Sequence, residues 1–351
     1  MICRLLLFSS LLLFVSCQSN KMASKEEPVK IILDTDMGSD ADDAGALALL
    51  HFYADMGKAE ILGVIYSSGK VPYGAAISQA INIYYGRSGI PVGADHEGVF
   101  GDPVDKMSAG KLARDTTAFR NTIVHNRDTE EQTELNRRLL ANSEDKSVTY
   151  LTIGHTRGLY KLLTSDPDEI SPLSGMELVQ QKVERWIALG ALGAHNEGGY
   201  FVRDWNFFFN DTQPYTKYLV ENFPSDAVFV DAGHEIMTGK SLKGTPRGNI
   251  VRTAYRDWLW WNNERTLDDQ RPSWDLVAVH YAVHGPGEWL VYAPQGWLEY
   301  DLEEGSRWNL GDSDRSHSYL MEKEGIRQEF ADYLNEMIGR TPKKYDPELW
   351  N

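Results

Sequence analysis

Short apolar runs rich in β-branched residues alternate along this chain with stretches that have the composition of helices. The runs cover residues 29–33, 61–66, 148–153, 186–192 and 227–230. Runs this short and continuous are typical of strands that are buried on both faces of a sheet. Their alternation with helices predicts an α/β fold, in which a mostly parallel central sheet carries helices on both faces.

Helices are predicted between these strands and after the last of them. Their ranges are residues 44–53, 75–85, 131–142, 159–164, 214–222, 273–283 and 324–338. A short strand is predicted at residues 90–92, and a hairpin or two strands at residues 289–301. The polar, glycine-containing stretch at residues 96–128 gives no clear prediction. In a parallel sheet, ligands bind beyond the carboxyl ends of the strands, so the loops after residues 33, 153 and 192 are the candidate binding loops.

The N-terminal residues have the pattern of a targeting segment. Arg4 precedes an apolar run at residues 5–15, which is too short to span a bilayer as a helix. Ser16 and Cys17 end this run in a pattern that resembles the bacterial lipobox; an ordinary signal peptide with an incidental cysteine is the alternative. We expect a lipoprotein signal peptide at residues 1–16, a polar linker at 17–28 and one α/β domain at 29–351. Lipidation of Cys17 would anchor a secreted protein to the bacterial cell envelope.

Charge and cysteine content narrow the classes of partner and metal site. The net charge of −16 makes nucleic acid a poor candidate partner, because an acidic surface repels phosphate backbones. The two cysteines are Cys3 and Cys17. Cleavage would remove the first and lipidation would modify the second, so any metal would be held by oxygen or imidazole. The membrane would be contacted only through the lipid anchor.

Five carboxylates fall within ten residues directly after the first predicted strand. The segment from Asp34 to Asp43 reads Asp-Thr-Asp-Met-Gly-Ser-Asp-Ala-Asp-Asp. Carboxylates this close together repel one another unless protons or a cation neutralise them, and hard oxygen ligands favour calcium or magnesium. A solvated acidic turn that caps the next helix is the alternative, but a cap needs only one or two acidic residues. An EF-hand is excluded because Ser39 stands where that loop needs glycine.

This segment resembles the first motif of the nucleoside hydrolases, Asp-x-Asp-x-Gly-x-Asp-Asp before an Ala/Leu-rich helix, with two extra residues before the final Asp pair. Further segments at residues 61–70, 150–162, 186–206 and 273–282 resemble, in order, the second strand and loop, the calcium loop, the glycine-rich loop and the last metal-binding helix of that family. The resemblance implies the Rossmann-like nucleoside hydrolase fold.

The resemblance also implies a calcium centre. Asp36 would bind the metal and act as general base on a water bound to it. Asp43 would chelate the ion, and Asp275 would complete the carboxylate set from the far end of the chain. The backbone carbonyl of Ile153 would be a further ligand. Asp34 would support these ligands from behind.

The implied substrate contacts depart from the family pattern at two positions. Asp42 and Asn206 would hold the ribose 2′- and 3′-hydroxyls, and Asp204, which replaces a family glutamate, would reach toward the 5′-hydroxyl. Lys70 falls where the family has an asparagine beside the sugar. Trp274 falls where the family has a histidine that protonates the leaving base in some members.

Aromatic and histidine residues leave alternatives open. Seven of the ten tryptophans lie between positions 258 and 308, a pattern that favours a second core layer. The other interpretation is that Trp205 and Trp274 sandwich a base or a sugar. His155, His195 and His234 are each candidates for a leaving-group acid, although a lone histidine is more often structural.

The sequence therefore predicts a calcium-dependent hydrolase that cleaves an N-glycosidic bond of a nucleoside or related glycoside. The oxocarbenium-like transition state of such a reaction suits carboxylates around the sugar and one carboxylate that takes a proton from water. A lipoprotein that binds a sugar or nucleoside without turnover is the alternative. The small-molecule substrate, its leaving group and any homo-oligomer are left open.

Overall fold

The computed structural model of this chain describes residues 27–344. The predicted signal peptide, Cys17 and most of the linker lie outside the described residues. Within the described part, no helix is both long enough and apolar enough to cross a membrane.

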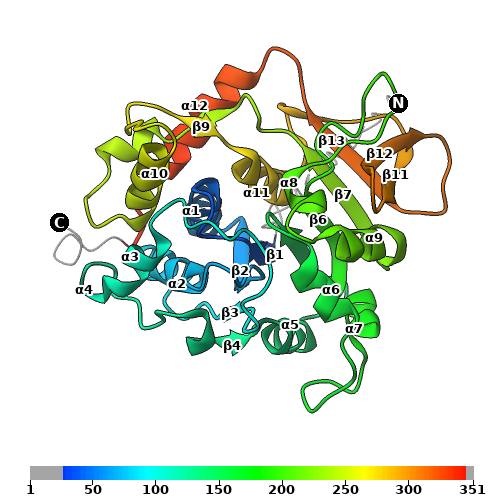
Figure 1. The fold of residues 1–351 in the computed structure, drawn as a ribbon, viewed down its shortest axis with the longest axis horizontal. Coiled ribbons are helices and arrows are strands. Elements are labelled where there is room, and N and C mark those ends of the chain that lie inside the picture. The colour runs from blue at the N-terminus through cyan, green and yellow to red at the C-terminus, as the bar shows by residue number, and fades with distance from the viewer. Residues whose placement is uncertain (1–26, 345–351) are drawn as a thin grey trace, which may run out of the picture.

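Nine strands of the described chain form one sheet in the order β10-β13-β7-β6-β5-β1-β2-β3-β4. Figure 1 labels most of them, from β13 and β7 on one side to β3 and β4 on the other. Every neighbouring pair is parallel except β10 and β13, which are antiparallel at the edge. The bounds are β1 Val29–Thr35, β2 Ala59–Tyr66, β3 Val92–Ala94, β4 Glu130–Glu131, β5 Val148–Thr152, β6 Val183–Leu189, β7 Asp226–Asp231, β10 Leu290–Tyr292 and β13 His317–Glu322. Two small sheets pair β8 Met237–Thr238 with β9 Arg271–Pro272, and β11 Gly296–Asp301 with β12 Gly305–Leu310.

Helices surround this sheet (Figure 1). Their bounds are α1 Asp42–Asp55, α2 Gly74–Tyr84, α3 Ala109–Arg114, α4 Thr116–Phe119, α5 Gln132–Ala141, α6 Arg157–Leu163, α7 Gly175–Lys182, α8 Trp205–Phe208, α9 Gln213–Asn222, α10 Ile250–Trp261, α11 Trp274–His284 and α12 Arg327–Ile338, with 3₁₀ turns at Asn126–Asp128 and Lys240–Gly244.

Each face of the sheet has its own apolar core. Successive side chains of a strand point to opposite faces, and in β1 Ile31 and Leu33 belong to one core while Ile32 belongs to the other. The first core contains residues of α1, α2, α10, α11 and α12, and the second contains residues of α5, α6, α7 and α9. The continuous apolar character of β1 follows from this burial on both sides.

The order of the strands reverses at β1. From β1 the chain adds β2, β3 and β4 on one side, and it then crosses back to place β5 on the other side. Ligands in open α/β sheets bind beyond the carboxyl ends of the strands at such a reversal. Asp36 follows β1 and Ile153 follows β5, so the predicted metal ligands lie at this point of the sheet.

The predicted α/β class and mostly parallel sheet are confirmed. All of the strands predicted between residues 29 and 230 are present, with ends that differ by a few residues; the strand predicted at 186–192, for example, is β6 Val183–Leu189. The sequence did not predict β13 or α10. Strand β13, with the sequence HSYLME, is only partly buried and therefore lacks the continuous apolar character that marks the central strands.

Candidate active site

The acidic segment forms the end of β1, a turn, and the start of α1. Asp34 lies inside β1 and is fully buried. Asp36 follows the strand, and Gly38 then turns the chain with a φ of +121°, a conformation that favours glycine. Asp42 and Asp43 occupy the first turn of α1. Because a helix N-terminus carries partial positive charge, this position favours both carboxylates.

Three buried carboxylates from two helices meet at this point. Asp275 lies in the first turn of α11, which packs against α1. Asp42, Asp43 and Asp275 each place a carboxylate oxygen within 4.8 Å of the others, and they are called the carboxylate trio below. At this distance, residues far apart in the chain lie close enough together to share one ion, and the binding of that ion stays a prediction. Asp42, expected to hold the sugar diol, belongs to this trio, whereas Asp36 does not.

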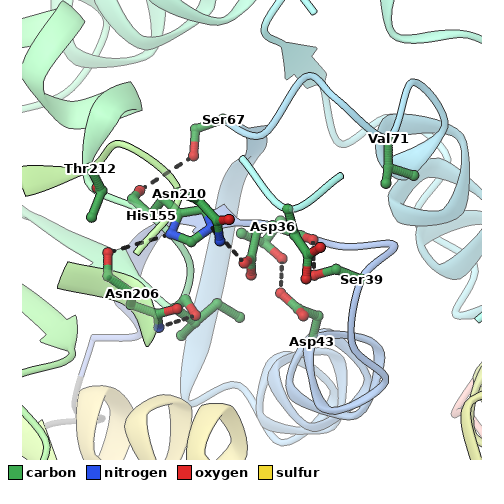
Figure 2. A network of polar contacts seen from close by, with 12 residues as sticks. Asp36, Ser39, Asp43, Ser67, Val71, His155, Asn206, Asn210 and Thr212 are labelled. Atoms are coloured by element: carbon green, nitrogen blue, oxygen red, sulfur yellow. Dashed lines mark hydrogen bonds and ion pairs between the residues drawn. The ribbon is translucent and has the colours of Figure 1, made fainter. Parts of the chain in front are cut away.

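Asp36 lies beside the trio and is only 6% exposed. Figure 2 shows its side chain between His155 and Asp43. The Oδ2 atom of Asp36 is 3.6 Å from Nε2 of the fully buried His155. Gly154 allows this approach, because a Cβ atom there would lie 2.6 Å from the backbone nitrogen of Asp36. The strand end of β5 therefore holds Asp36 in place.

The atoms around the trio fit a hard divalent cation. Oδ1 of Asp43 accepts a hydrogen bond from the hydroxyl of Thr35 (Figure 2), but its buried Oδ2 has no hydrogen-bond partner. A buried anionic oxygen without a partner is costly unless an ion neutralises it. Ile153, whose carbonyl is the further predicted ligand, lines the same cavity. Oxygen donors of this kind suit calcium or magnesium, and the described residues contain no cysteine.

The side-chain amide of Asn206 organises the carbonyl side of the site. Its Nδ2 donates to the carbonyls of Ile153 and Leu189, at 3.1 Å each. Asp204 holds the turn that carries Asn206: its carboxylate accepts from the backbone nitrogens of Ala191, Asn206 and Phe207 at 3.0–3.1 Å. Asp204 is thus the N-cap of α8, a role that the sequence-based expectation of a 5′-hydroxyl contact did not include.

Burial dominates the electrostatics of these acids. It raises the pKa of Asp36 and of all three trio members, that of Asp42 to about 7, and the neighbouring carboxylates add to the shift in each trio member. Burial raises the pKa of Asp34 to about 8, although hydrogen bonds from Ser67 and Tyr150 oppose this. A bound divalent cation would reverse these shifts by favouring the ionised forms.

Two adjoining cavities open at the site. The first cavity, of about 240 Å³, is lined by Asp36, Ser39, Asp40, Asp42, Asp43, Asp102, Lys106, Ile153, Leu189, Leu192, Asp204, Trp205, Asn206, Trp274 and Asp275. The second cavity, of about 350 Å³, is lined by Leu192, Asp231, Ala232, His234, Trp274, Met321 and Glu322. Leu192 and Trp274 belong to both, so the two cavities share a wall.

Lys70 is not among the residues that line the first cavity, and the cation that lines it is Lys106. Its Nζ pairs with Asp102 at 3.0 Å and lies 5.1 Å from the centre of the Trp205 ring. Asp102 and Lys106 come from residues 96–128, a stretch without a clear prediction from the sequence. Residues 96–128 show neither the period of a strand nor that of a helix. Only the folded structure therefore shows that this loop reaches the site.

The tryptophans and histidines singled out in the sequence lie in different surroundings. Trp205, 46% exposed, and Trp274 both line the first cavity, whereas Trp308 is buried in a core. His155 contacts Asp36, and the ring of His234 lies 5.7 Å from that of Trp274 in the second cavity. Trp308 therefore fits the core interpretation, whereas a sandwich of a base or a sugar between Trp205 and Trp274 stays a prediction.

Comparison with known proteins shows which solved structures share this fold. No family sequence model and no characterised protein matches the chain in sequence. A plant nucleoside hydrolase matches in structure with a TM-score of 0.62 and 17% identity, over 89% of this chain and 99% of its own. The inosine-uridine preferring nucleoside hydrolase from Bacillus anthracis gives 0.60 and 14%, over 88% and 99%. The type III effector XopQ, solved with adenosine diphosphate ribose, gives 0.61 and 14%, over 90% and 93%.

The chain therefore has a nucleoside hydrolase-like fold, as the acidic motif and the other four segments led us to expect. Identities of 14–17% establish the fold and not the activity.

The buried acids predict how the stability of the metal-free protein depends on pH. The pKa of Asp34 rises from 3.8 to about 8 on folding. Such a group stabilises the folded state fully below about pH 4, and this contribution is lost as the pH rises through about 8. We expect the melting temperature in a chelator to fall between about pH 5 and pH 8, and the fall to be smaller in Asp34→Asn. Thermal unfolding across this range tests it, and a flat profile for the metal-free parent would contradict it.

Proposed function

We propose that this protein is a calcium-dependent hydrolase that cleaves the N-glycosidic bond of a nucleoside or a related glycoside. The observation that carries the proposal is the meeting of Asp42, Asp43 and Asp275 within 4.8 Å, beside Asp36, at the reversal point of the sheet. The nucleoside hydrolase-like fold supports it.

Asp36 is the group that takes the proton from the attacking water. It lines the first cavity, and its Oδ2 faces Nε2 of His155. A bound calcium ion would orient the sugar diol and make a nearby water more acidic. Burial raises the pKa of Asp36, which brings a carboxylate closer to the range in which it accepts a proton well at neutral pH. His155 positions the Asp36 carboxylate and does not line the cavity itself.

The sugar would lie in the first cavity against the acidic wall. Asp42 and Asn206 line this cavity and would contact the sugar hydroxyls, and Trp205 offers an aromatic face at the cavity edge. The positive charge that develops on the sugar in an oxocarbenium-like transition state is stabilised by these carboxylates.

The leaving group would lie against Trp274 and extend toward the second cavity. The volume of the first cavity, about 240 Å³, is small for a whole glycoside, because pockets for drug-sized ligands hold about 300–1,000 Å³. Asp231, His234 and Glu322 line the second cavity. Since acidic residues line both cavities, a substrate whose leaving group is neutral or cationic before cleavage binds better than one whose leaving group already carries a negative charge.

The location of the protein belongs to the same proposal. The short apolar run before Cys17 and the polar linker after it support a lipoprotein anchored in the bacterial cell envelope.

Calcium binding should depend on the trio. Asp275→Asn removes one of three anionic donors, so we expect the calcium dissociation constant to rise by at least about 100-fold. Substitution of residues that only hydrogen-bond to metal ligands typically weakens metal binding by roughly 10–100-fold. Isothermal titration calorimetry measures it. Asp102→Asn is the matched control, because Asp102 lines the same cavity but pairs with Lys106. Equal calcium affinity of the parent and Asp275→Asn would refute the metal centre.

Asp36→Asn should abolish turnover and leave the fold intact. The amide has nearly the size of the carboxylate but cannot serve as a base, and the loss of a general base lowers rates by about 10²–10⁴-fold. Steady-state kinetics with calcium, together with melting temperatures, test this. An Asn variant as active as the parent would refute the role. Binding of ribose by a parent that hydrolyses no glycoside would instead indicate a binding protein.

The parent should hydrolyse plain inosine and uridine poorly. Trp274 cannot protonate a leaving base, and the loss of a general acid lowers rates by about 10²–10⁴-fold. We therefore expect better turnover of p-nitrophenyl riboside, whose leaving group needs no acid. Steady-state kinetics on the three substrates compare them. A kcat/KM on inosine within the upper range of about 10⁶–10⁸ M⁻¹s⁻¹ would show that Trp274 carries no such consequence.

A further inference from the structure

Arg271 is a fully buried cation in contact with the acidic segment. It lies in β9, four residues before Asp275. Its Nη2 pairs with Oδ1 of Asp42 at 3.0 Å, and its Nη1 pairs with the carboxylate of Asp40. Its Nε donates to the carbonyl of Pro272 at 2.7 Å. The guanidinium thus makes two ion pairs with the acidic loop and one hydrogen bond within β9, and its Nη1 and Nη2 make no hydrogen bond.

Two tryptophans hold the guanidinium in place. Its central carbon lies 4.4 Å from the centre of the Trp258 ring and 5.6 Å from that of Trp274. Stacking of this kind on ring faces is favourable for a planar cation, more so where water is excluded. The side chain is therefore fixed in position and is not a mobile surface charge that pairs with the aspartates by chance.

The acidic loop supplies two carboxylates that pair with this arginine. Asp40 and Ala41 are the two residues by which the loop exceeds the shorter motif described above. Asp40 supplies the second carboxylate for Arg271, while Asp42 links the arginine to the trio. Among residues 27–344, no arginine or lysine other than Arg271 forms an ion pair with a trio member. Carboxylates this close and this buried repel one another strongly unless a cation reduces their charge.

We infer that Arg271 is a built-in counter-cation of the trio. It keeps the three carboxylates assembled when no divalent cation is bound, and it weakens the binding of a divalent cation by adding positive charge beside the site. The cation would then exchange readily, and metal removal would leave the site folded. This inference rests on the metal centre in the proposed function.

The assembly of the trio without metal and the weakening of metal binding can be measured separately. In Arg271→Met, a side chain of comparable length fills the space without charge. We expect its metal-free melting temperature to fall by several degrees, and calcium to restore more stability than it gives the parent. Its calcium dissociation constant should fall by about tenfold or more, because removal of a positive charge near a divalent ion strengthens binding. Arg271→Lys, which keeps the charge, should stay near the parent.

Arg265→Met is the matched control. Arg265 also lies near the Trp258 ring, at 5.9 Å, but it donates to the carbonyl of Gln270 and not to the acidic loop. Its calcium affinity should equal that of the parent. Differential scanning fluorimetry with and without calcium, and calorimetric calcium titration, measure all of these variants without any substrate.

Asp40→Asn provides a test of opposite sign that does not depend on the folding of Arg271→Met. It removes negative charge and leaves Arg271 to act on Asp42 alone, so calcium should bind less tightly than to the parent. Weaker calcium binding by Arg271→Met would overturn the counter-cation role and make Arg271 a positioning residue for Asp42. Equal metal-free melting temperatures of Arg271→Met and Arg265→Met would also overturn it. A parent that binds no calcium would refute the metal centre, whereas the metal-free melting temperatures would still test the assembly of the trio.

Discussion

The burial of several carboxylates at one point of the sheet is the constraint on which this structure depends. Two unit charges of the same sign about 4 Å apart repel by about 4 kcal/mol at an effective dielectric constant of about 20, and the trio places three such groups within 4.8 Å. The fold offsets part of this repulsion. Asp42 and Asp43 occupy the N-terminal turn of α1, and Asp275 occupies that of α11, where helix dipoles favour negative charge. Arg271 adds an ion pair with Asp42.

The architecture explains why these groups meet although they are far apart in sequence. Strand β1 lies at the reversal of strand order, so the loops after β1 and β5 diverge and leave space between them. Helix α11 packs on α1 and brings Asp275 to the same space from the other end of the chain. Gly154 then lets β5 approach Asp36 closely. A cation site at this position thus needs the whole sheet, and not only the acidic loop.

The local part of this site could be predicted from the sequence, and the long-range part could be predicted only in outline. A buried strand followed by five carboxylates within ten residues is a local pattern, and neighbouring carboxylates repel one another whatever the rest of the fold. This pattern predicted Asp34, Asp36, Asp42 and Asp43 as site residues. Asp275 and Ile153 came from the resemblance, because nothing near them in sequence marks a ligand. Asp102 and Lys106 were missed because residues 96–128 lack periodicity, and Arg271 was missed because an isolated arginine before a helix looks like a surface residue until its burial is known.

Arg271 also gives a physical reason for the tryptophan at position 274. The guanidinium lies 5.6 Å from the centre of the Trp274 ring. A protonated histidine at this position would place a second cation against Arg271, which would lower the pKa of that histidine and remove the proton that an acid must donate. An indole instead offers the guanidinium a π face and offers both cavities an apolar wall. The longer acidic loop, the buried arginine and the tryptophan are therefore coupled features: Asp40 and Asp42 hold Arg271, and Arg271 favours an aromatic residue over an acid at the wall between the two cavities.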